Sequence, residues 1–461
     1  MEANVQVPFK IGDITLEQVA ADFVRRAQTH ELHVGVLGMG YVGLPLAQAF
    51  LRQGLRVTGF DIDAHKIDAL LNGRSYIAHI SGESVEAMNE LGRFDATSNF
   101  DRLNEPDAIL ICVPTPLNEY REPDLAYVVK STEEIAKRLR PGQLVVLEST
   151  TWPGTSEQVM KPILERVSGL VSGRDFAIAY SPEREDPGNQ NFETADIPKV
   201  VGANTALELE MGVAVYDQIV PKVVPVSSLA TAEAIKLTEN VFRWVNIGLV
   251  NELKLIFDKM NIDVWEVING AATKPFGFMP FYPGPGLGGH CIPIDPYYLT
   301  WKARGYGMST RFIELAGDIN QNMPRHVVTR LGEALNDKSG KAIAKSKVLL
   351  VGLAYKKNVD DLRESPSLEL LKLLRERGAE VDYYDPYFPT APDIHEHQEI
   401  KGMQSVPWTR DNLQTYDVAL IATDHDKVNY RLLCEMVPVI VDTRNATKDL
   451  QGEFAAKIVK A

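Results

Sequence analysis

The sequence predicts an α/β protein with two doubly wound parallel-sheet domains, joined by a long central helix and a helical region. A strand, a glycine turn, a helix and a second strand are indicated at residues 32–61, and the same order recurs at 347–385. Between these units, a proline-free run at 228–270 carries apolar residues at helical spacing. Strands that alternate with helices favour parallel sheets whose faces are covered by helices.

Further strands are indicated after each of these units. In the first half they are "DAILICVP", "QLVVLEST" and "FAIAYSPE", and in the second half "DVALIATD" and "VIVDTRN". Each apolar run ends in a polar or proline-marked loop. Because ligands of open parallel sheets gather at the carboxyl ends of the strands, we expect functional residues in these loops.

The domain order follows from these elements. We expect an N-terminal extension at 1–30, a first sheet domain at 31–205, a central helical domain with a glycine-rich loop at 206–335, and a second sheet domain at 336–461. The extension is predicted to hold a short amphipathic helix. One helix over 228–270 would carry both lobes, and its length suits the interface of a homodimer or higher homo-oligomer.

The composition excludes some classes of protein. Of 461 residues, 45% are hydrophobic and 24% charged, as in ordinary globular proteins. The net charge of −14 argues against nucleic acid or an anionic membrane as partner, because both attract clustered Lys and Arg. No apolar stretch approaches the roughly 20 residues that span a bilayer, and no signal pattern begins the chain, so we expect a cytoplasmic protein.

The first glycine turn has the spacing of a dinucleotide site. Gly38, Gly40 and Gly43 follow a predicted strand and open a helix, and Asp61 ends the next strand. Such glycines permit a tight turn, close approach of a pyrophosphate, and close packing of helix on strand. The contacts expected from this turn are Gly38, Met39, Gly40, Tyr41, Val42 and Gly43.

This pattern predicts a Rossmann-like domain that binds NAD. Asp61 would hydrogen-bond the ribose diol and repel a 2′-phosphate, which favours NAD over NADP. Lys66 is either a further cofactor contact or a solvated helix charge. The second Rossmann-like sheet lacks the second and third glycines, but Lys356, Lys357 and Arg363 follow its first strand. They indicate a different phosphate ligand or, alternatively, a solvated basic loop.

Three cysteines give no disulfide framework, and their spacing gives no metal site. Cys112 and Cys434 lie in apolar runs and are predicted to be small buried hydrophobes. Cys291 instead lies in "GPGLGGHCIPIDP", where Gly286, Gly288 and Gly289 would let a substrate approach the sulfur. His290 beside it is expected to serve in packing or in the substrate pocket rather than in the chemistry.

A thiol beside a nicotinamide site has a specific use. Oxidation of an alcohol to a carbonyl needs no sulfur, but a thiolate can add to an aldehyde, lose a second hydride and leave a thioester for hydrolysis. Lys236 and Asn240, four residues apart, offer an ammonium and an amide that can stabilise an oxyanion, unless they are simply exposed to solvent. Asp295 could order a water or assist its deprotonation.

Several stretches together resemble the UDP-glucose/UDP-mannuronate dehydrogenase family over roughly residues 31–445. They are "GMGYVGLPLA", "CVPTPL", "EST", "SPERE", "KLTEN", "GPGLGGHCIPIDP" and "GLAYKKNVDDLRESPS". Their order, their spacing and the three-part layout agree with that family. The resemblance implies an N-terminal NAD domain, a central dimerisation region and a C-terminal UDP-binding domain. It also implies oxidation of C6 of a UDP-hexose to a uronate with two NAD+.

The resemblance also implies roles for single residues. Cys291 would be the nucleophile, Lys236 and Asn240 the oxyanion pair, and Asp295 the carboxylate that assists water. Thr150 and Glu183 match residues that hold a catalytic water. The positions that match the cofactor lining are Val113, Thr115, Ser149 and Thr150. Those that match substrate contacts are Lys236, Asn240, Gly288, Lys356 and Arg363.

Two departures bear on the substrate. UDP-glucose enzymes usually have a second Glu four residues after the position of Glu183, where this chain has Pro187. They also tend to have a Lys where this chain has Ile294. The sequence is more similar to the branch acting on UDP-N-acetylhexosamines, and most similar to UDP-N-acetyl-D-glucosamine 6-dehydrogenases of bacterial surface-polysaccharide pathways. Arg184 is expected to line the sugar-nucleotide pocket.

Four alternatives are left, two of them other substrates and two of them other functions. UDP-N-acetylmannosamine and UDP-glucose are the competing substrates. A two-electron β-hydroxyacid dehydrogenase would share an NAD domain and a lysine–asparagine pair, but it would need neither Cys291 nor a second sheet. A sensor that binds NAD and a UDP-sugar without turnover would not need the thiol.

Overall fold

The structure is a computed structural model that describes residues 16–77, 80–184, 196–289, 292–394 and 397–461. The chain divides into two compact units. The first comprises Met1–Glu239 with Tyr297–Met308, and the second Asn240–Pro296 with Ser309–Ala461. Each unit contains one sheet.

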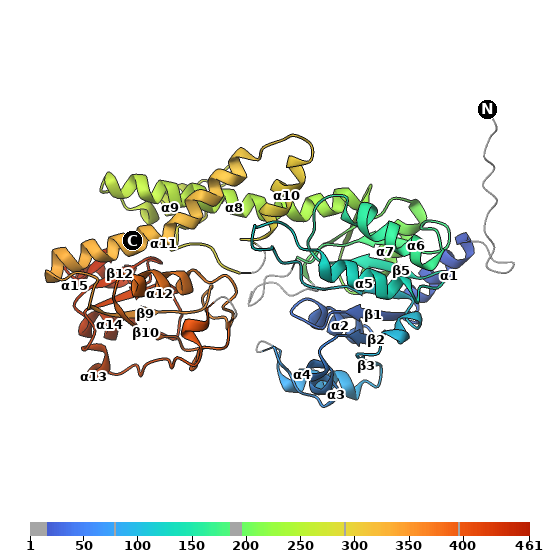
Figure 1. Ribbon diagram of the computed structural model, residues 1–461, viewed down its shortest axis with the longest axis horizontal. Coiled ribbons are helices and arrows are strands. Elements are labelled where there is room, and N and C mark those ends of the chain that lie inside the picture. Colours follow the sequence, from blue (N-terminus) through green and yellow to red (C-terminus); the bar gives the residue numbers. More distant parts are fainter. Residues whose placement is uncertain (1–15, 78–79, 185–195, 290–291, 395–396) are drawn as a thin grey trace. The chain divides into compact units, whose positions relative to one another are not determined.

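The first unit holds a sheet of eight described strands in the order β3-β2-β1-β4-β5-β6-β7-β8 (Figure 1). All neighbours are parallel except β6 and β7. The chain leaves β1 toward one edge and returns to β4 on the other side, so the direction of winding reverses between β1 and β4. The strands are β1 (His33–Leu37), β2 (Arg56–Phe60), β3 (Phe94–Thr97), β4 (Ala108–Ile111), β5 (Leu144–Leu147), β6 (Ala177–Tyr180), β7 (Lys199–Gly202) and β8 (Val223–Val226).

The boundary expected at residue 205 falls inside this sheet. Helix α7 (Ala206–Tyr216) packs on β6 and β7, and β8 adds a strand beyond it. The core is formed by strand side chains and by the inner faces of the helices. The other helices of this unit are α2 (Gly43–Arg52), α3 (Ala64–Leu71), α4 (Gly82–Glu90), η1 (Phe100–Asn104), α5 (Ala126–Ala136), η2 (Ser156–Met160) and α6 (Lys161–Ser168).

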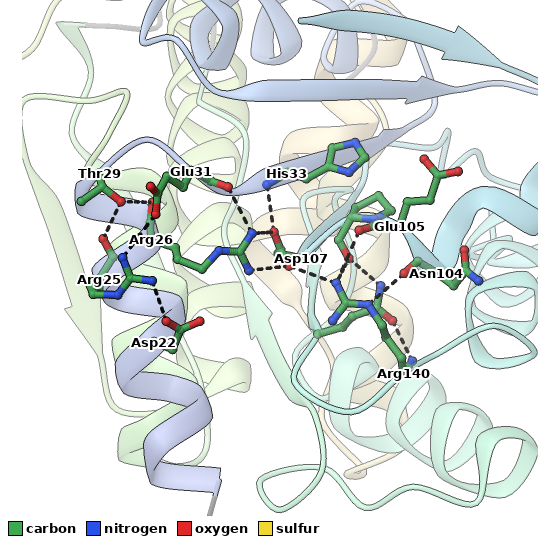
Figure 2. A network of polar contacts seen from close by, with 12 residues as sticks. Asp22, Arg25, Arg26, Thr29, Glu31, His33, Asn104, Glu105, Asp107 and Arg140 are labelled. Carbon is green, nitrogen blue, oxygen red and sulfur yellow. Dashed lines mark hydrogen bonds and ion pairs between the residues drawn. The ribbon is translucent and has the colours of Figure 1, made fainter. Parts of the chain in front are cut away.

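The predicted helix of the N-terminal extension is α1 (Leu16–Gln28), which packs against α7 through buried Ala20, Phe23 and Ala27. Ion pairs hold the C-terminal end of α1 to the sheet (Figure 2). Arg26 donates two hydrogen bonds to the buried carboxylate of Asp107, at 2.9 and 2.6 Å. Asp107 also accepts from Arg140 and from the backbone N–H of His33, each at 3.0 Å. One carboxylate thus joins α1 to the start of β1 and to the loop between α5 and β5.

The second unit holds a sheet of five described strands, all parallel, in the order β10-β9-β11-β12-β13 (orange to red in Figure 1). Here the winding reverses between β9 and β11. The elements are β9 (Lys347–Val351), α12 (Pro366–Glu376), β10 (Glu380–Tyr384), η4 (Gln398–Ile400), α13 (Arg410–Leu413), β11 (Val418–Ile421), α14 (Tyr430–Met436), β12 (Ile440–Asp442), η5 (Lys448–Leu450), α15 (Gln451–Phe454) and β13 (Ile458–Lys460).

The helical stretch at 228–270 is two helices rather than one. Helix α8 (Leu229–Lys259) ends before Asn261, which has a positive φ of 56°, and Asp263 caps α9 (Val264–Ala272) by accepting the N–H of Trp265. A left-handed residue cannot continue an α-helix, so the break is local. The remaining helices are α10 (Asp295–Arg304) and α11 (Arg311–Ser339).

The parallel second sheet, the first sheet with its single antiparallel pair, and the long helix α8 confirm the predicted fold class. Cys112 and Cys434 are buried, as predicted from the apolar runs around them. Among the described residues, none of the helices has the length and apolar character required to cross a bilayer.

Candidate functional site

The first glycine turn lies where the winding of the first sheet reverses. Gly38 follows β1 with a φ of 97°, and a Cβ there would lie 2.5 Å from the carbonyl oxygen of Cys112. A Cβ on Gly43 would collide with the carbonyl oxygen of Gly38. A Cβ on Gly40 would meet nothing within 4 Å. The fold therefore requires glycine at 38 and 43, whereas at Gly40 the backbone faces open space that a pyrophosphate can enter.

Asp61 stands at the carboxyl end of β2, beside this turn. Its carboxylate accepts the N–H of Met39 at 2.9 Å and the N–H of Asp63 at 3.0 Å, and Lys66 pairs with it at 3.3 Å. These contacts use three of the roughly four acceptor positions of a carboxylate, which leaves capacity for a ribose hydroxyl. The Lys66 ammonium is therefore paired with Asp61 while about a third of its side chain stays exposed. The residues present fit an NAD molecule.

The strands next to β1 bring further predicted residues to the same edge of the sheet. Ser149, after β5, donates a hydrogen bond to the carbonyl of Val113, after β4, at 2.7 Å. Thr115 is buried and Thr150 is partly buried. These side chains and the glycine turn belong to neighbouring parallel strands, so they lie along one line at the carboxyl edge.

A buried charged cluster, which the sequence patterns do not indicate, joins residues that follow β5 and β6 to the start of β7. Lys199 of β7 pairs with Glu148 at 2.7 Å and with Glu183 at 3.5 Å. The hydroxyl of Tyr216 donates to Glu148. Glu148 and Lys199 are both almost fully buried. In the sequence, the only sign of this cluster is that Lys199 begins an apolar segment. A lysine at that position is most often exposed to solvent at the end of a strand.

The charges of the cluster depend on one another. Burial raises the pKa of Glu148 to about 7, although Lys199 opposes that shift. Burial alone would lower the pKa of Lys199, but the carboxylates of Glu148 and Glu183 raise it above its ordinary value. Lys199 therefore stays charged at neutral pH and forms an ion pair with the Glu183 carboxylate.

Glu183 is also held by the chain around it. Lys236 of α8 is buried, and its ammonium donates to the backbone carbonyl of Glu183. The N–H of Arg184 donates to the Glu183 carboxylate at 2.6 Å. The Arg184 guanidinium itself pairs with Glu239 and donates to the carbonyl of Pro198 at 2.7 Å. A ligand that contacts Arg184 must therefore compete with Glu239.

Within the second unit, Asn240 and Asp295 form a buried pair. The side-chain amide of Asn240 on α8 donates to the carboxylate of Asp295, the first residue of α10. Neither side chain is exposed to solvent by more than a few per cent, so the alternative of a solvated asparagine is excluded. His290 and Cys291 lie outside the described residues, while Gly289 and Asp295 flank them in the sequence.

The glycine-rich loop before Cys291 packs against the loop that follows β9. A Cβ on Gly288 would lie 2.6 Å from the Cβ of Tyr355 and 2.9 Å from the carbonyl oxygen of Glu364. Gly289, at a φ of 85°, donates its N–H to the carbonyl of Arg363 at 2.9 Å. Glycine is needed at 288 because only a bare backbone fits this contact.

The loop after β9 holds the three predicted cations in different ways. Lys356 is partly buried, and Lys357 is exposed and pairs with Asp426 at 3.0 Å. Arg363 is held by Asp361, at 2.6 Å for the closest pair of atoms. Asp385, at the end of β10, occupies the place that Asp61 has in the first sheet. It is almost fully buried and accepts the N–H groups of Leu353 and Ala354, so its carboxylate cannot face a ribose.

Comparison with known families identifies the same three-part layout. The NAD binding domain of the UDP-glucose/GDP-mannose dehydrogenase family matches residues 32–220, its central domain matches 230–322, and its UDP binding domain matches 349–449. The first glycine turn falls in the first of these segments, the glycine-rich loop before Cys291 in the second, and the loop after β9 in the third.

Individual relatives cover most of the chain. A UDP-N-acetyl-D-glucosamine 6-dehydrogenase of Salmonella typhi is 36% identical over 399 residues, which are 86% of this chain and 91% of that protein. One from Pseudomonas aeruginosa is 38% identical over 368 residues, 80% of this chain and 86% of that protein. A solved UDP-D-ManNAc dehydrogenase of Pyrococcus horikoshii has a TM-score of 0.80 at 32% identity, covering 90% of this chain and 96% of that one.

Proposed function

Because the chain belongs to the UDP-glucose/GDP-mannose dehydrogenase family and is an NAD-dependent UDP-sugar dehydrogenase, we propose that it oxidises UDP-N-acetyl-D-glucosamine to the uronate. The proposed reaction removes four electrons at C6, uses two NAD+ and passes through a thioester on Cys291. The product would serve as a precursor of a bacterial surface polysaccharide. The observation that carries the proposed chemistry is the buried pair of Asn240 and Asp295, because Asp295 follows Cys291 by four residues in the sequence.

In the first oxidation, C6 of the sugar changes from alcohol to aldehyde. The turn that runs from Gly38 to Gly43 would hold the pyrophosphate of NAD+, and one NAD+ for each oxidation would accept the hydride. Lys236 and Asn240 donate hydrogen bonds to the oxygen at C6 as charge develops on it, and a water held by Glu183 and Thr150 takes the proton. The burial of Lys236 supports this role, because a buried ammonium interacts strongly with a developing negative charge.

In the second stage, the thiolate of Cys291 adds to the aldehyde carbon. Loss of hydride from the adduct leaves a thioester, and a water assisted by Asp295 cleaves the C–S bond to release the carboxylate and the thiol. The amide of Asn240 fixes the Asp295 carboxylate so that it can accept a proton from that water. On the substrate side, Lys356, Arg363 and the backbone of Gly288 are proposed to contact the UDP group.

The stoichiometry separates this mechanism from its two-electron alternative. Purified protein incubated with limiting UDP-sugar and excess NAD+ should form two NADH per sugar. Cys291→Ala should form no uronate and should still bind NAD+, which is measured by calorimetry. One NADH per sugar in the wild type, or normal uronate from Cys291→Ala, would contradict the thioester route.

The configuration of the sugar is tested directly. NAD+ reduction should be measured in parallel with UDP-N-acetylglucosamine, UDP-N-acetylmannosamine, UDP-glucose and UDP-N-acetylgalactosamine, and kcat/KM should be highest for the first. UDP-N-acetylmannosamine is the second candidate, because the solved UDP-D-ManNAc dehydrogenase covers 90% of this chain. A higher kcat/KM for that sugar would replace the proposed substrate.

We also propose a homo-oligomer formed through the central helices. Phe242, Leu249 and Ile256 on α8 are about half exposed, and Phe312 and Leu315 on α11 more than half. Large apolar side chains gathered on such helices are typical of an interface between subunits. Sedimentation at micromolar concentration should give a mass of at least two chains, and a monomer would refute the proposal.

A further inference from the structure

A buried histidine lies where the winding of the second sheet reverses. His425 follows β11 and has no exposed surface. Its Nδ1 accepts the backbone N–H of Asn358 at 3.0 Å, and its Nε2 lies 3.0 Å from the Asp385 carboxylate. Because Nδ1 is an acceptor, the ring proton is on Nε2 and is donated to Asp385. Both ring nitrogens are therefore occupied by different segments of the chain.

Asp385 holds a second point of the same loop. Its carboxylate accepts the N–H groups of Leu353 and Ala354, at 2.7 and 3.0 Å. The loop after β9 is thus attached to Asp385 directly at its beginning and through His425 at Asn358. Lys356 lies between these two attachments.

The side chain of Asn358 completes the attachment. Asn358 has a positive φ of 60° and accepts the N–H of Asp426 at 3.0 Å, while its amide donates back to the Asp426 carboxylate at 2.5 Å. Between the two attachments, Tyr355 donates its N–H to the carbonyl of Asp361, the residue that holds Arg363. This hydrogen bond connects the segment held at Ala354 and Asn358 to Arg363.

Arg363 connects this loop to the glycine-rich loop, since its carbonyl accepts the N–H of Gly289. Replacing His425 with an apolar residue would fill the same space, but it would leave the Asn358 N–H without its acceptor and would remove one of the donors to the buried Asp385 carboxylate. An unpaired buried group of this kind costs far more than the loss of one exposed hydrogen bond.

We propose that His425 is a positioning residue for the UDP-sugar: its neutral imidazole connects Asp385 to Asn358 and so fixes the loop at 353–364 in the conformation that presents Lys356 and Arg363 and supports Gly289. His425 does not itself touch the ligand. This inference rests on the proposed function of Lys356 and Arg363 as contacts of the UDP group.

Two substitutions distinguish the contributions of the two ring nitrogens of His425. In His425→Asn the side-chain oxygen can take the place of Nδ1 and accept from Asn358, whereas in His425→Gln the amide can take the place of Nε2 and donate to Asp385. Calorimetry of the full chain with UDP should give about tenfold weaker binding for His425→Gln, and a smaller loss for His425→Asn. KM for the UDP-sugar should rise with kcat little changed, and KM for NAD+ should stay constant.

The controls distinguish positioning from general stability. Tyr383→Phe removes buried hydrogen bonds to Phe388 and Met403 in the same sheet, away from the loop, and should leave UDP affinity unchanged. Equal UDP affinity in wild type and His425→Gln would overturn the inference, provided that Arg363→Ala weakens UDP binding. If Arg363→Ala also binds UDP normally, the proposed UDP site itself is wrong. If His425→Gln is insoluble, an unchanged KM for the UDP-sugar in His425→Asn overturns the inference.

Discussion

Gly40 and Gly43 allow the requirements of the fold to be separated from those of the cofactor. They lie three residues apart in the same turn, and the same substitution, Gly→Ala, can be made at both. A Cβ at 43 would collide with the carbonyl oxygen of Gly38, whereas a Cβ at 40 would meet nothing within 4 Å. Gly40 also has no positive φ, so alanine is compatible with its backbone.

The expected magnitudes follow from these contacts. Gly40→Ala should leave the free energy of unfolding unchanged or raise it by about 0.4–1 kcal/mol, because alanine restricts the unfolded chain. Its NAD+ affinity should fall at least tenfold, about 1.4 kcal/mol, because the added methyl occupies the space that the pyrophosphate needs. Gly43→Ala should instead destabilise the first unit by about 1–3 kcal/mol, since backbone and helix must separate.

Urea unfolding, followed by tryptophan fluorescence, and calorimetry with NAD+ measure the two effects on the same samples. UDP binding to the second unit serves as the control and should be unchanged in both variants. If Gly40→Ala lost as much stability as Gly43→Ala, or if it bound NAD+ as tightly as the wild type, the assignment of the open space to the cofactor would be wrong.

Lys199→Met should destabilise the first unit by about 3–5 kcal/mol in urea, because it leaves the buried carboxylate of Glu148 without its counter-charge. Glu148→Gln in the same chain should recover much of that loss, and failure to recover it would exclude this ion pair as the cause. Burial lowers the pKa of His33 to about 4, so the unfolded chain takes up its proton first as the pH falls below 6.5. Stability should therefore drop by about 2 kcal/mol between pH 7 and pH 5, and His33→Gln should remove that part of the pH dependence. Asp61→Asn keeps an acceptor for the Met39 N–H but removes the charge, so the ratio of kcat/KM for NAD+ over NADP+ should fall about tenfold or more; an unchanged ratio would assign the discrimination elsewhere.

The sequence was sufficient where one short segment determines the structure. The spacing of Gly38, Gly40 and Gly43 specifies a turn, and its position after an apolar run specifies the edge of the sheet at which the turn lies. Both sheets were predictable for the same reason, since a strand and the following helix carry their own periodicity.

The partners of buried charges were not predictable in this way. Lys199 and Glu148 are 51 residues apart, and nothing near either residue indicates the other. The acids that end β2 and β10 look alike in the sequence, yet Asp61 keeps an acceptor position open while Asp385 is enclosed by two N–H groups and His425. Only the folded loop distinguishes a carboxylate available to a ribose from one that is used to hold the backbone.

The attachment of α1 has a practical consequence for anyone dividing this protein. The matched NAD binding domain begins at residue 32, after α1 has ended. A fragment that begins at residue 32 would lack Phe23 and Ala27, which cover α7. It would also lack Arg26, one of the two arginines that pair with Asp107. The fragment would expose an apolar surface on α7 close to a carboxylate that has lost one of its counter-charges. We expect it to aggregate more readily than a fragment that begins upstream of α1.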